Sequence, residues 1–121
     1  MRDEEKKMSE YAWPLVDHET AWDMIQNDKD VIVVDVRLPF EYDKGHWPRA
    51  INVINEMIDA DYAAANLPDK DAKYLIYCRT GNRSHQACWQ LNELGYTNLM
   101  DGGGIMDWPY EIVKEKKGVS F

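Results

Sequence analysis

The stretch KYLIYCRTGNRSHQACWQLNELG (73–95) decides the fold of this chain. Its first residues, Lys73–Tyr77, form a largely apolar run of strand length, and the polar loop Cys78–Ser84 follows directly. Apolar side chains then recur at the i, i+4, i+7 spacing of a helix that ends at Gly95: Ala87, Leu91 and Leu94. Strand, loop and helix in this order indicate a repeating unit of an α/β domain.

The same alternation continues on both sides of this unit. Val31–Val34 is a continuous β-branched run ending at Asp35, which is typical of a strand covered on both faces of a parallel sheet. Strands separated by helical segments imply right-handed crossovers and a parallel sheet between helices. The remaining elements are expected as a helix from the N-cap Asp17 to Asn27, a short strand at Ile51–Ile54, a helix over Asn55–Asn66 closed by Pro68, and a last strand at Leu99–Met100.

Length and charge restrict the classes of protein to consider. The 121 residues suit one domain, and we expect a charged lead-in at 1–14 followed by a single domain at 15–121. The net charge of -8 argues against nucleic acid or an anionic membrane as partner. Two cysteines are too few for a disulfide framework or a cysteine zinc site, and the three histidines are scattered. We therefore expect no structural metal, and we expect no cofactor.

The sequence indicates a cytoplasmic protein. Its charged start lacks the apolar core of a secretory signal, and no stretch approaches the length of a membrane span. Met1 favours a complete chain over a domain cut from a longer enzyme. In a reducing compartment Cys78 and Cys88 remain thiols, so each is a core residue or a reactive group.

Cys78 is the sharpest chemical feature of the sequence. In open α/β sheets ligands bind beyond the carboxyl ends of the strands, where both Asp35 and Cys78 are expected. A helix start and neighbouring cations favour a thiolate, and Gly81 allows successive amides to form an anion-binding nest. Residues 78–85 hold two arginines and no acid, against nine acids and four basic residues in 1–30. The loop is therefore basic within an acidic protein.

Three blocks of the sequence resemble the rhodanese-type sulfurtransferases, in that family's order. They are the loop Cys78-Arg-Thr-Gly-Asn-Arg83-Ser84, the upstream signature from Asp35-Val-Arg37 through Glu41-Tyr42 and Gly45-His46 to Ala50-Ile-Asn52, and the closing motif Gly102-Gly103-Gly104 with Trp108. One departure is Trp47-Pro48-Arg49, where members usually carry a small apolar residue, proline and glycine. This departure is expected to alter the local turn.

The resemblance implies a rhodanese-like α/β domain, with a central parallel five-stranded sheet and helices on both faces. It implies that Cys78 takes a sulfane sulfur from thiosulfate or a persulfide and passes it to a thiophilic acceptor such as cyanide, a thiol or a thioredoxin-like protein. An ionised thiolate needs no general base for this step. The substrate-binding residues expected from the resemblance are Arg79, Thr80, Gly81, Asn82, Arg83 and Ser84.

Other candidate residues carry structural alternatives. Ser84 is also a candidate helix cap. The side chains of Thr80 and Asn82 either donate hydrogen bonds to the sulfur donor or only shape the loop. Asp35 and Arg37 are expected to order the loop or to line the pocket rim, with an i, i+4 pair from Arg37 to Glu41 if that segment is helical. The remaining candidates are expected as a turn anchor at His46, a packing thiol at Cys88 with a resolving thiol as the alternative, and core or rim aromatics at Trp89 and Trp108.

Two other functions share parts of this pattern. Cysteine-dependent phosphatases and arsenate reductases also place a cysteine loop between strand and helix, but related cell-cycle phosphatases have a longer loop than the four residues between Cys78 and Arg83. A non-catalytic rhodanese-like binding module is the second alternative, and such modules usually lack the cysteine. The sequence therefore favours a sulfurtransferase.

Overall fold

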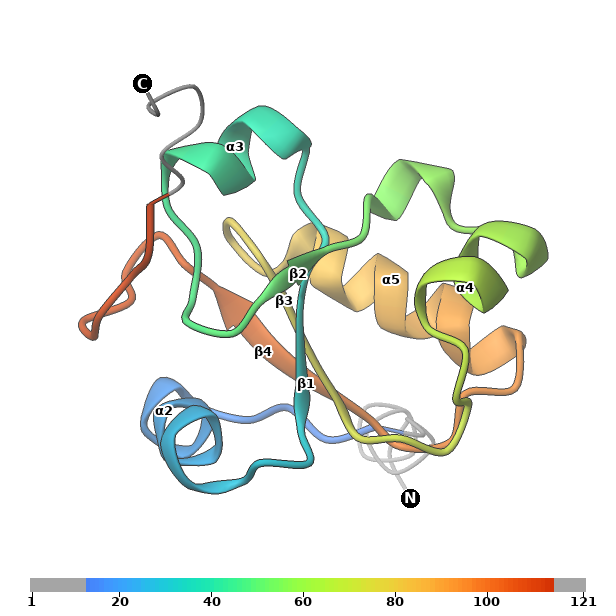
Figure 1. Cartoon of the computed structure of the whole chain (residues 1–121), viewed down its shortest axis with the longest axis horizontal. Coiled ribbons are helices and arrows are strands. Elements are labelled where there is room, and N and C mark those ends of the chain that lie inside the picture. The colour runs from blue at the N-terminus through green and yellow to red at the C-terminus, as the bar shows by residue number, and fades with distance from the viewer. Residues whose placement is uncertain (1–12, 115–121) are drawn as a thin grey trace, which may run out of the picture.

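A parallel sheet of four strands forms the centre of the computed structural model, which describes residues 13–114 (Figure 1). The strand order is β2-β1-β3-β4, and every neighbouring pair is parallel. The strands are β1 Ile32–Asp35, β2 Ile51–Asn52, β3 Tyr74–Cys78 and β4 Leu99–Gly104. The helices are α2 His18–Asn27, α3 Pro39–Lys44, the 3-10 turn η1 Asn55–Met57, α4 Ala60–Asn66 and α5 Asn82–Glu93.

Strand β3 separates two hydrophobic cores, as the sequence predicted for a sheet covered on both faces. All five of its residues are buried. Tyr74, Ile76 and Cys78 point into the core shared with α4 and α5, where Cys88 and Leu91 also pack. Leu75 and Tyr77 alternate into the second core, which α2 closes with Ala21 and Ile25. Figure 1 shows α4 and α5 on one side of the sheet and α2 on the other.

The expected fifth strand is wrong for the described residues. Leu15 makes only an isolated parallel bridge to Asp101 on the free side of β4. The bridge consists of Val16 N donating to Asp101 O at 2.9 Å and Asp101 N donating to Pro14 O at 3.0 Å. Pro14 has no N–H, so it cannot donate the next hydrogen bond that would extend this pairing.

Several expected elements are confirmed, with changed boundaries. The first helix begins after Asp17, whose Oδ1 accepts from Thr20 N at 2.8 Å. The single helix expected over 55–66 is wrong, because extended backbone at Asp59 separates η1 from α4. Asp59 caps α4 by accepting from Tyr62 N at 2.8 Å. Strand β2 is shorter than expected, while β4 continues through the glycines.

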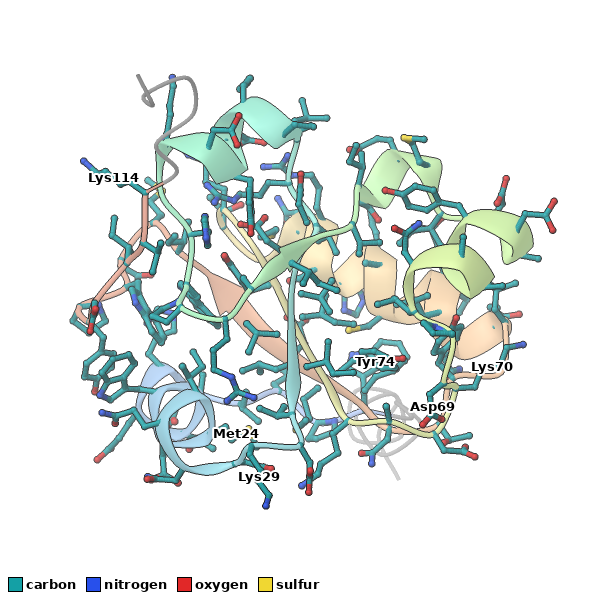
Figure 2. All side chains as sticks on the ribbon, in the orientation of Figure 1. Met24, Lys29, Asp69, Lys70, Tyr74 and Lys114 are labelled. Carbon is teal, nitrogen blue, oxygen red and sulfur yellow. The ribbon has the colours of Figure 1, made fainter. Side chains whose placement is uncertain are left out.

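The carboxyl ends of the strands share one edge of the sheet, next to α3 (Figure 1). Lys29 and Asp69, which precede β1 and β3, lie at the opposite edge (Figure 2). Nearly all of the lead-in expected at 1–14 lies outside the described residues, as do residues 115–121. No helix within 13–114 has the length and apolar character needed to cross a bilayer.

Candidate active site

Cys78 is the last residue of β3, and its thiol lies at the start of α5. Gly81 N donates a hydrogen bond to Cys78 Sγ at 2.9 Å. The residue is only 1% exposed, because β3 is buried up to its carboxyl end. The expected succession of buried strand, cysteine loop and helix is confirmed, and a backbone amide faces the sulfur.

Gly81 sets the geometry of this contact. It is the N-cap of α5 with φ 107° and ψ -12°, a backbone conformation that side-chain-bearing residues rarely adopt. A Cβ built at this position would meet only Gly103 Cα, at an ordinary 3.9 Å. The conformation, rather than the available space, therefore requires glycine at the turn that points the amide at sulfur.

The first turn of α5 adds further positive potential at the sulfur. The N–H groups of Asn82, Arg83 and Ser84 are the first of the helix and have no intrahelical acceptor. A helix of twelve residues also places the positive end of its dipole here, and its first turn holds no acidic side chain. This end of α5 therefore favours an anionic ligand.

The two arginines of the loop occupy different environments. Arg83 forms a two-pronged ion pair with Glu41 of α3, with Nη1 to Oε1 at 2.8 Å and Nη2 to Oε2 at 3.1 Å. The hydrogen bond from Arg83 lowers the pKa of Glu41 to about 2, and the same bond raises the pKa of Arg83. Arg79 is exposed, and within residues 13–114 its side chain forms no hydrogen bond or ion pair. The geometry therefore leaves Arg79 open to an incoming anion.

Ser84 lies inside the protein rather than facing a ligand. It is fully buried, and its Oγ donates to Asp101 Oδ1 at 2.8 Å. Asp101 Oδ1 also accepts from Gly103 N at 2.9 Å. Asp101 thus joins the first turn of α5 to β4, a role for which the sequence carries no local signal. Thr80 and Asn82 are exposed beside Arg79.

The glycines at the end of β4 allow the chain to pass close behind the cysteine loop. A Cβ on Gly104 would lie 2.1 Å from Arg79 O, so no other residue fits without a backbone shift. The close approach is fixed by Ile105 N donating to Cys78 O at 2.9 Å and Met106 N donating to Arg79 O at 3.0 Å. The glycine motif therefore supports the loop from the neighbouring strand.

Asp35 and Arg37 form a closed network beside the site. Both are buried, and Arg37 Nη2 lies 2.7 Å from Asp35 Oδ2 and 2.7 Å from Gly45 O. Tyr77 OH donates to Asp35 Oδ2 at 2.7 Å, and burial together with the Asp35 charge raises the pKa of Tyr77. The expected pair from Arg37 to Glu41 is wrong, because Arg37 pairs with Asp35 while Glu41 pairs with Arg83.

The Trp47-Pro48-Arg49 departure is accommodated by new contacts. Arg49 has φ 71°, the conformation that usually favours glycine. Its guanidinium donates to carbonyls at the end of α2 and before β1, at 2.7 to 3.3 Å: Ile25, Asp28, Lys29 and Val31. Trp47 is fully buried and stacks on Tyr77 and Trp108, at centroid distances of 3.9 and 4.0 Å.

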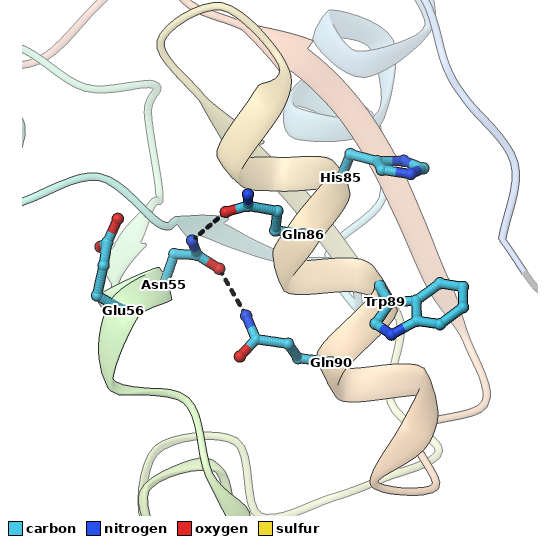
Figure 3. Close-up of a pocket in the computed structure, with 6 residues that line it drawn as sticks. All are labelled: Asn55, Glu56, His85, Gln86, Trp89 and Gln90. Atoms are coloured by element: carbon cyan, nitrogen blue, oxygen red, sulfur yellow. Dashed lines mark hydrogen bonds between the residues drawn. The ribbon is translucent and has the colours of Figure 1, made fainter.

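The side chains of the other candidates form no hydrogen bond with the cysteine loop within residues 13–114. Cys88 is buried, and burial raises the pKa of its thiol. His46 Nδ1 lies 3.0 Å from Tyr42 O. Trp89 is 55% exposed on α5, so it is not a core residue. With His85 it lines a pocket of about 460 Å³, whose other lining residues are Asn55, Glu56, Gln86 and Gln90 (Figure 3).

Such a strand, cysteine loop and helix define a class that includes sulfurtransferases and cysteine-dependent phosphatases. Within it, the chain belongs to the rhodanese-like domain family, which matches residues 17–109. It is 35% identical over 94 residues to a sulfurtransferase of Allochromatium vinosum, covering 77% of this chain and 85% of the relative. It is 38% identical over 81 residues to the thiosulfate sulfurtransferase PspE of Escherichia coli, covering 67% and 77%.

Solved structures agree with this assignment. A structure described as rhodanese with anions from E. coli superposes with a TM-score of 0.63 at 34% identity, covering 70% of this chain and 99% of that chain. The family expected from the sequence motifs is therefore confirmed, and the matched relatives identify it as a family of rhodanese-type sulfurtransferases.

Proposed function

We propose that this protein is a thiosulfate or persulfide sulfurtransferase in which Cys78 carries the sulfur. The observation that carries the proposal is the Gly81 amide, 2.9 Å from a cysteine sulfur at the start of α5. In the first step the Cys78 thiolate attacks the outer sulfur of thiosulfate. A new S–S bond forms, the S–S bond of thiosulfate breaks, and sulfite leaves with its electron pair.

The second step returns the cysteine to its starting state. An acceptor thiolate or cyanide attacks the outer sulfur of the Cys78 persulfide, the S–S bond breaks, and its electron pair stays on Cys78 Sγ. The outer sulfur leaves on the acceptor as a persulfide or as thiocyanate. No general base is required, because the attacking groups are already anionic.

The loop residues have separate parts in this proposal. Arg79 pairs with the oxyanion of the donor, and the exposed Thr80 and Asn82 offer side-chain hydrogen bonds to it. Arg83 acts through position, because its ion pair with Glu41 holds the first turn of α5 against α3. The amides from Gly81 to Ser84 stabilise negative charge on the transferred sulfur.

A phosphatase or arsenate reductase is the alternative, and the state of Arg83 argues against it. An arginine that cradles a tetrahedral oxyanion must present its fork to that anion. Here both prongs of the fork lie on Glu41. A non-catalytic module is disfavoured by the amide contact to Cys78, which a purely structural thiol does not require. We further propose a reducing, cytoplasmic setting, in which both cysteines remain thiols.

The test is transfer of one sulfur atom. Incubation with thiosulfate should add the mass of one sulfur to the protein, and addition of cyanide should remove it as thiocyanate. Cys78→Ser should abolish both events, while the control Cys88→Ser, which changes the other buried thiol, should retain them. Hydrolysis of a chromogenic phosphate ester without a sulfur adduct would support the phosphatase instead. If neither activity depends on Cys78, the binding module is favoured.

A further inference from the structure

Strand β4 is irregular where it passes the cysteine loop. Asp101 of β4 pairs with Ile76 of β3, but the next pair along is Gly103 with Tyr77. Gly102 is therefore skipped, as in a β-bulge. Asp101, the last residue before the skip, is only 4% exposed. A buried carboxylate costs free energy unless it accepts hydrogen bonds, so the partners of Asp101 show what it stabilises.

The Asp101 carboxylate joins the bulge in β4 to the start of α5. Its Oδ1 accepts from Ser84 Oγ at 2.8 Å and from Gly103 N at 2.9 Å. Ser84 lies in the first turn of α5 and is fully buried, so its hydroxyl does not face a ligand. Gly103 has φ 82°, so the second bond stabilises the backbone conformation that follows the skipped residue. One carboxylate oxygen thus fixes α5 relative to the bulge.

The other end of the cysteine loop is held by the backbone just after the bulge. Ile105 N donates to Cys78 O at 2.9 Å, and Met106 N donates to Arg79 O at 3.0 Å. These bonds hold the first two residues of the loop, while Asp101 holds its last residue. Both ends of the loop therefore depend on the conformation of β4.

The hydrogen bond to sulfur lies between these two fixed ends. Gly81 N donates to Cys78 Sγ at 2.9 Å, and a Cβ on Gly81 would lie only 3.9 Å from Gly103 Cα. A shift of the bulge or of the first turn of α5 would therefore move this amide. A displacement of about 1 Å in a group that positions a reaction can cost roughly 100-fold in rate. The geometry at the sulfur is thus sensitive to a contact outside the loop.

The charge of Asp101 does not itself assist an anionic sulfur. Burial, and to a smaller extent the Asp101 charge, raises the pKa of the other buried thiol, Cys88. A negative charge disfavours a second negative charge nearby. A contribution of Asp101 to sulfur transfer therefore comes through the groups that it holds in place.

We propose that Asp101 is a positioning residue for sulfur transfer, which holds the first turn of α5 and the β4 bulge so that the Gly81 amide points at Cys78 Sγ. The proposal rests on the sulfurtransferase function and adds to it a residue outside the cysteine loop. Misplaced amides stabilise the charge on the transferred sulfur less well and so slow the chemical step. Arg79 still pairs with the donor oxyanion. Loss of Asp101 therefore lowers the maximal rate of sulfur loading and leaves the half-saturating thiosulfate concentration unchanged.

The test compares replacements of Asp101 in single-turnover sulfur loading from thiosulfate. Asp101→Ala removes the acceptor and should lower the maximal loading rate roughly 10- to 100-fold, with the half-saturating thiosulfate concentration within about twofold of wild type. Asp101→Asn keeps an oxygen acceptor of similar size and should retain the maximal rate within about threefold. Ser84→Ala removes one of the two bonds, so its rate should fall between those of the Asp101 variants.

A control and a spectroscopic signal separate positioning from stability. Tyr96→Phe is the matched control, because the buried Tyr96 OH lies within hydrogen-bond distance of Ala63 O and Leu67 O rather than of the cysteine loop. It should lower the unfolding midpoint and leave both loading parameters unchanged. The NMR resonance of the Gly81 amide reports on the contact to sulfur without any reaction. It should shift in Asp101→Ala and stay near its wild-type position in Asp101→Asn and Tyr96→Phe.

The outcomes that overturn the positioning role differ from failure of the function. Absence of sulfur loading in the wild-type protein overturns the sulfurtransferase function, while the Gly81 resonance still tests the positioning role. Normal loading and an unshifted Gly81 resonance in Asp101→Ala overturn the positioning role alone. Equal losses in Asp101→Asn assign the effect to charge, and equal losses in Tyr96→Phe assign it to stability, so either result also overturns it. If Asp101→Ala does not fold, an unchanged rate and resonance in Ser84→Ala overturn it.

Discussion

The loops that follow β1 and β3 leave the same edge of the sheet, yet they use their polar groups in opposite ways. After β1, the carboxylate of Asp35 accepts bonds from Arg37 and from Tyr77 OH, and Arg37 also reaches Gly45 O. After β3, the Gly81 amide points at a sulfur, and Arg79 is exposed. Saturated polar groups stabilise a loop, whereas groups left open at a strand end are available to a ligand.

The largest effect expected from this comparison is on stability. Asp35→Ala leaves the Arg37 charge buried without its carboxylate, and should cost about 3–5 kcal/mol in the free energy of unfolding. Urea denaturation measures this loss. Sulfur loading per folded molecule should remain, because the side-chain hydrogen bonds of Asp35 go to Arg37 and Tyr77 rather than to the thiol. A loss below about 1 kcal/mol would contradict the role assigned to the β1 loop.

The opposite result is expected for Arg79→Ala. The free energy of unfolding should change by no more than about 0.5 kcal/mol, since the side chain is exposed. The KM for thiosulfate should rise roughly 10- to 100-fold, the value of a hydrogen bond to a charged group. Lys29→Ala is the charge-matched control, because Lys29 is exposed at the far edge of the sheet (Figure 2). An equal rise in the KM for thiosulfate in both variants would show that Arg79 acts only through the overall charge of the protein and does not bind the donor.

The sequence predicted those parts of this contrast whose interacting residues lie close together along the chain. The buried run before Cys78, the glycine at position 81 and the helix after it lie within about twenty residues, so periodicity and turn chemistry predicted them. The ion pair from Arg83 to Glu41 spans 42 residues, and the bond from Ser84 to Asp101 spans 17. No local sequence pattern indicates pairs so far apart along the chain. The sequence therefore predicted Arg83 and Ser84 as substrate-binding residues.

The wrong strand count and the unpredicted contacts of Arg49 have the same kind of cause. The fifth strand came from the family pattern, but Pro14 lacks the N–H that would extend the bridge at Leu15. Arg49 stands where the family has glycine, and it adopts φ 71° because four carbonyls surround its guanidinium. These carbonyls come from residues 18 or more positions earlier, which a motif comparison does not consider.

A third prediction concerns the backbone of the β3 loop. Gly81→Ala should cost about 1–3 kcal/mol in the free energy of unfolding, because of its positive φ, and should also slow sulfur loading by moving the amide away from Cys78. Gly95→Ala is the matched control, since Gly95 has φ 98° at the far end of α5. Similar destabilisation with loading lost only at position 81 is expected. Equal loading rates in the two variants would show that the amide contact does not matter.

The smallest effect expected is a change in the pH dependence of stability. The pKa of Glu41 is about 2 in the folded protein against an ordinary value of 4.5, chiefly through its hydrogen bond from Arg83. A lowered pKa means that the pair stabilises the fold above about pH 4.5 and that this contribution is lost as pH falls toward 2.

Glu41→Gln should therefore lower stability by about 1 kcal/mol at pH 7 and by less at pH 2. Acid titration of the unfolding midpoint measures the difference, with the exposed Glu19→Gln as control. If the difference in stability between wild type and Glu41→Gln is constant across this range, the ion pair is not what orients Arg83.

The same variant also addresses the contrast between the loops, because it releases Arg83. A fall in the KM for thiosulfate would then show that Glu41 leaves Arg79 as the principal charge met by the donor.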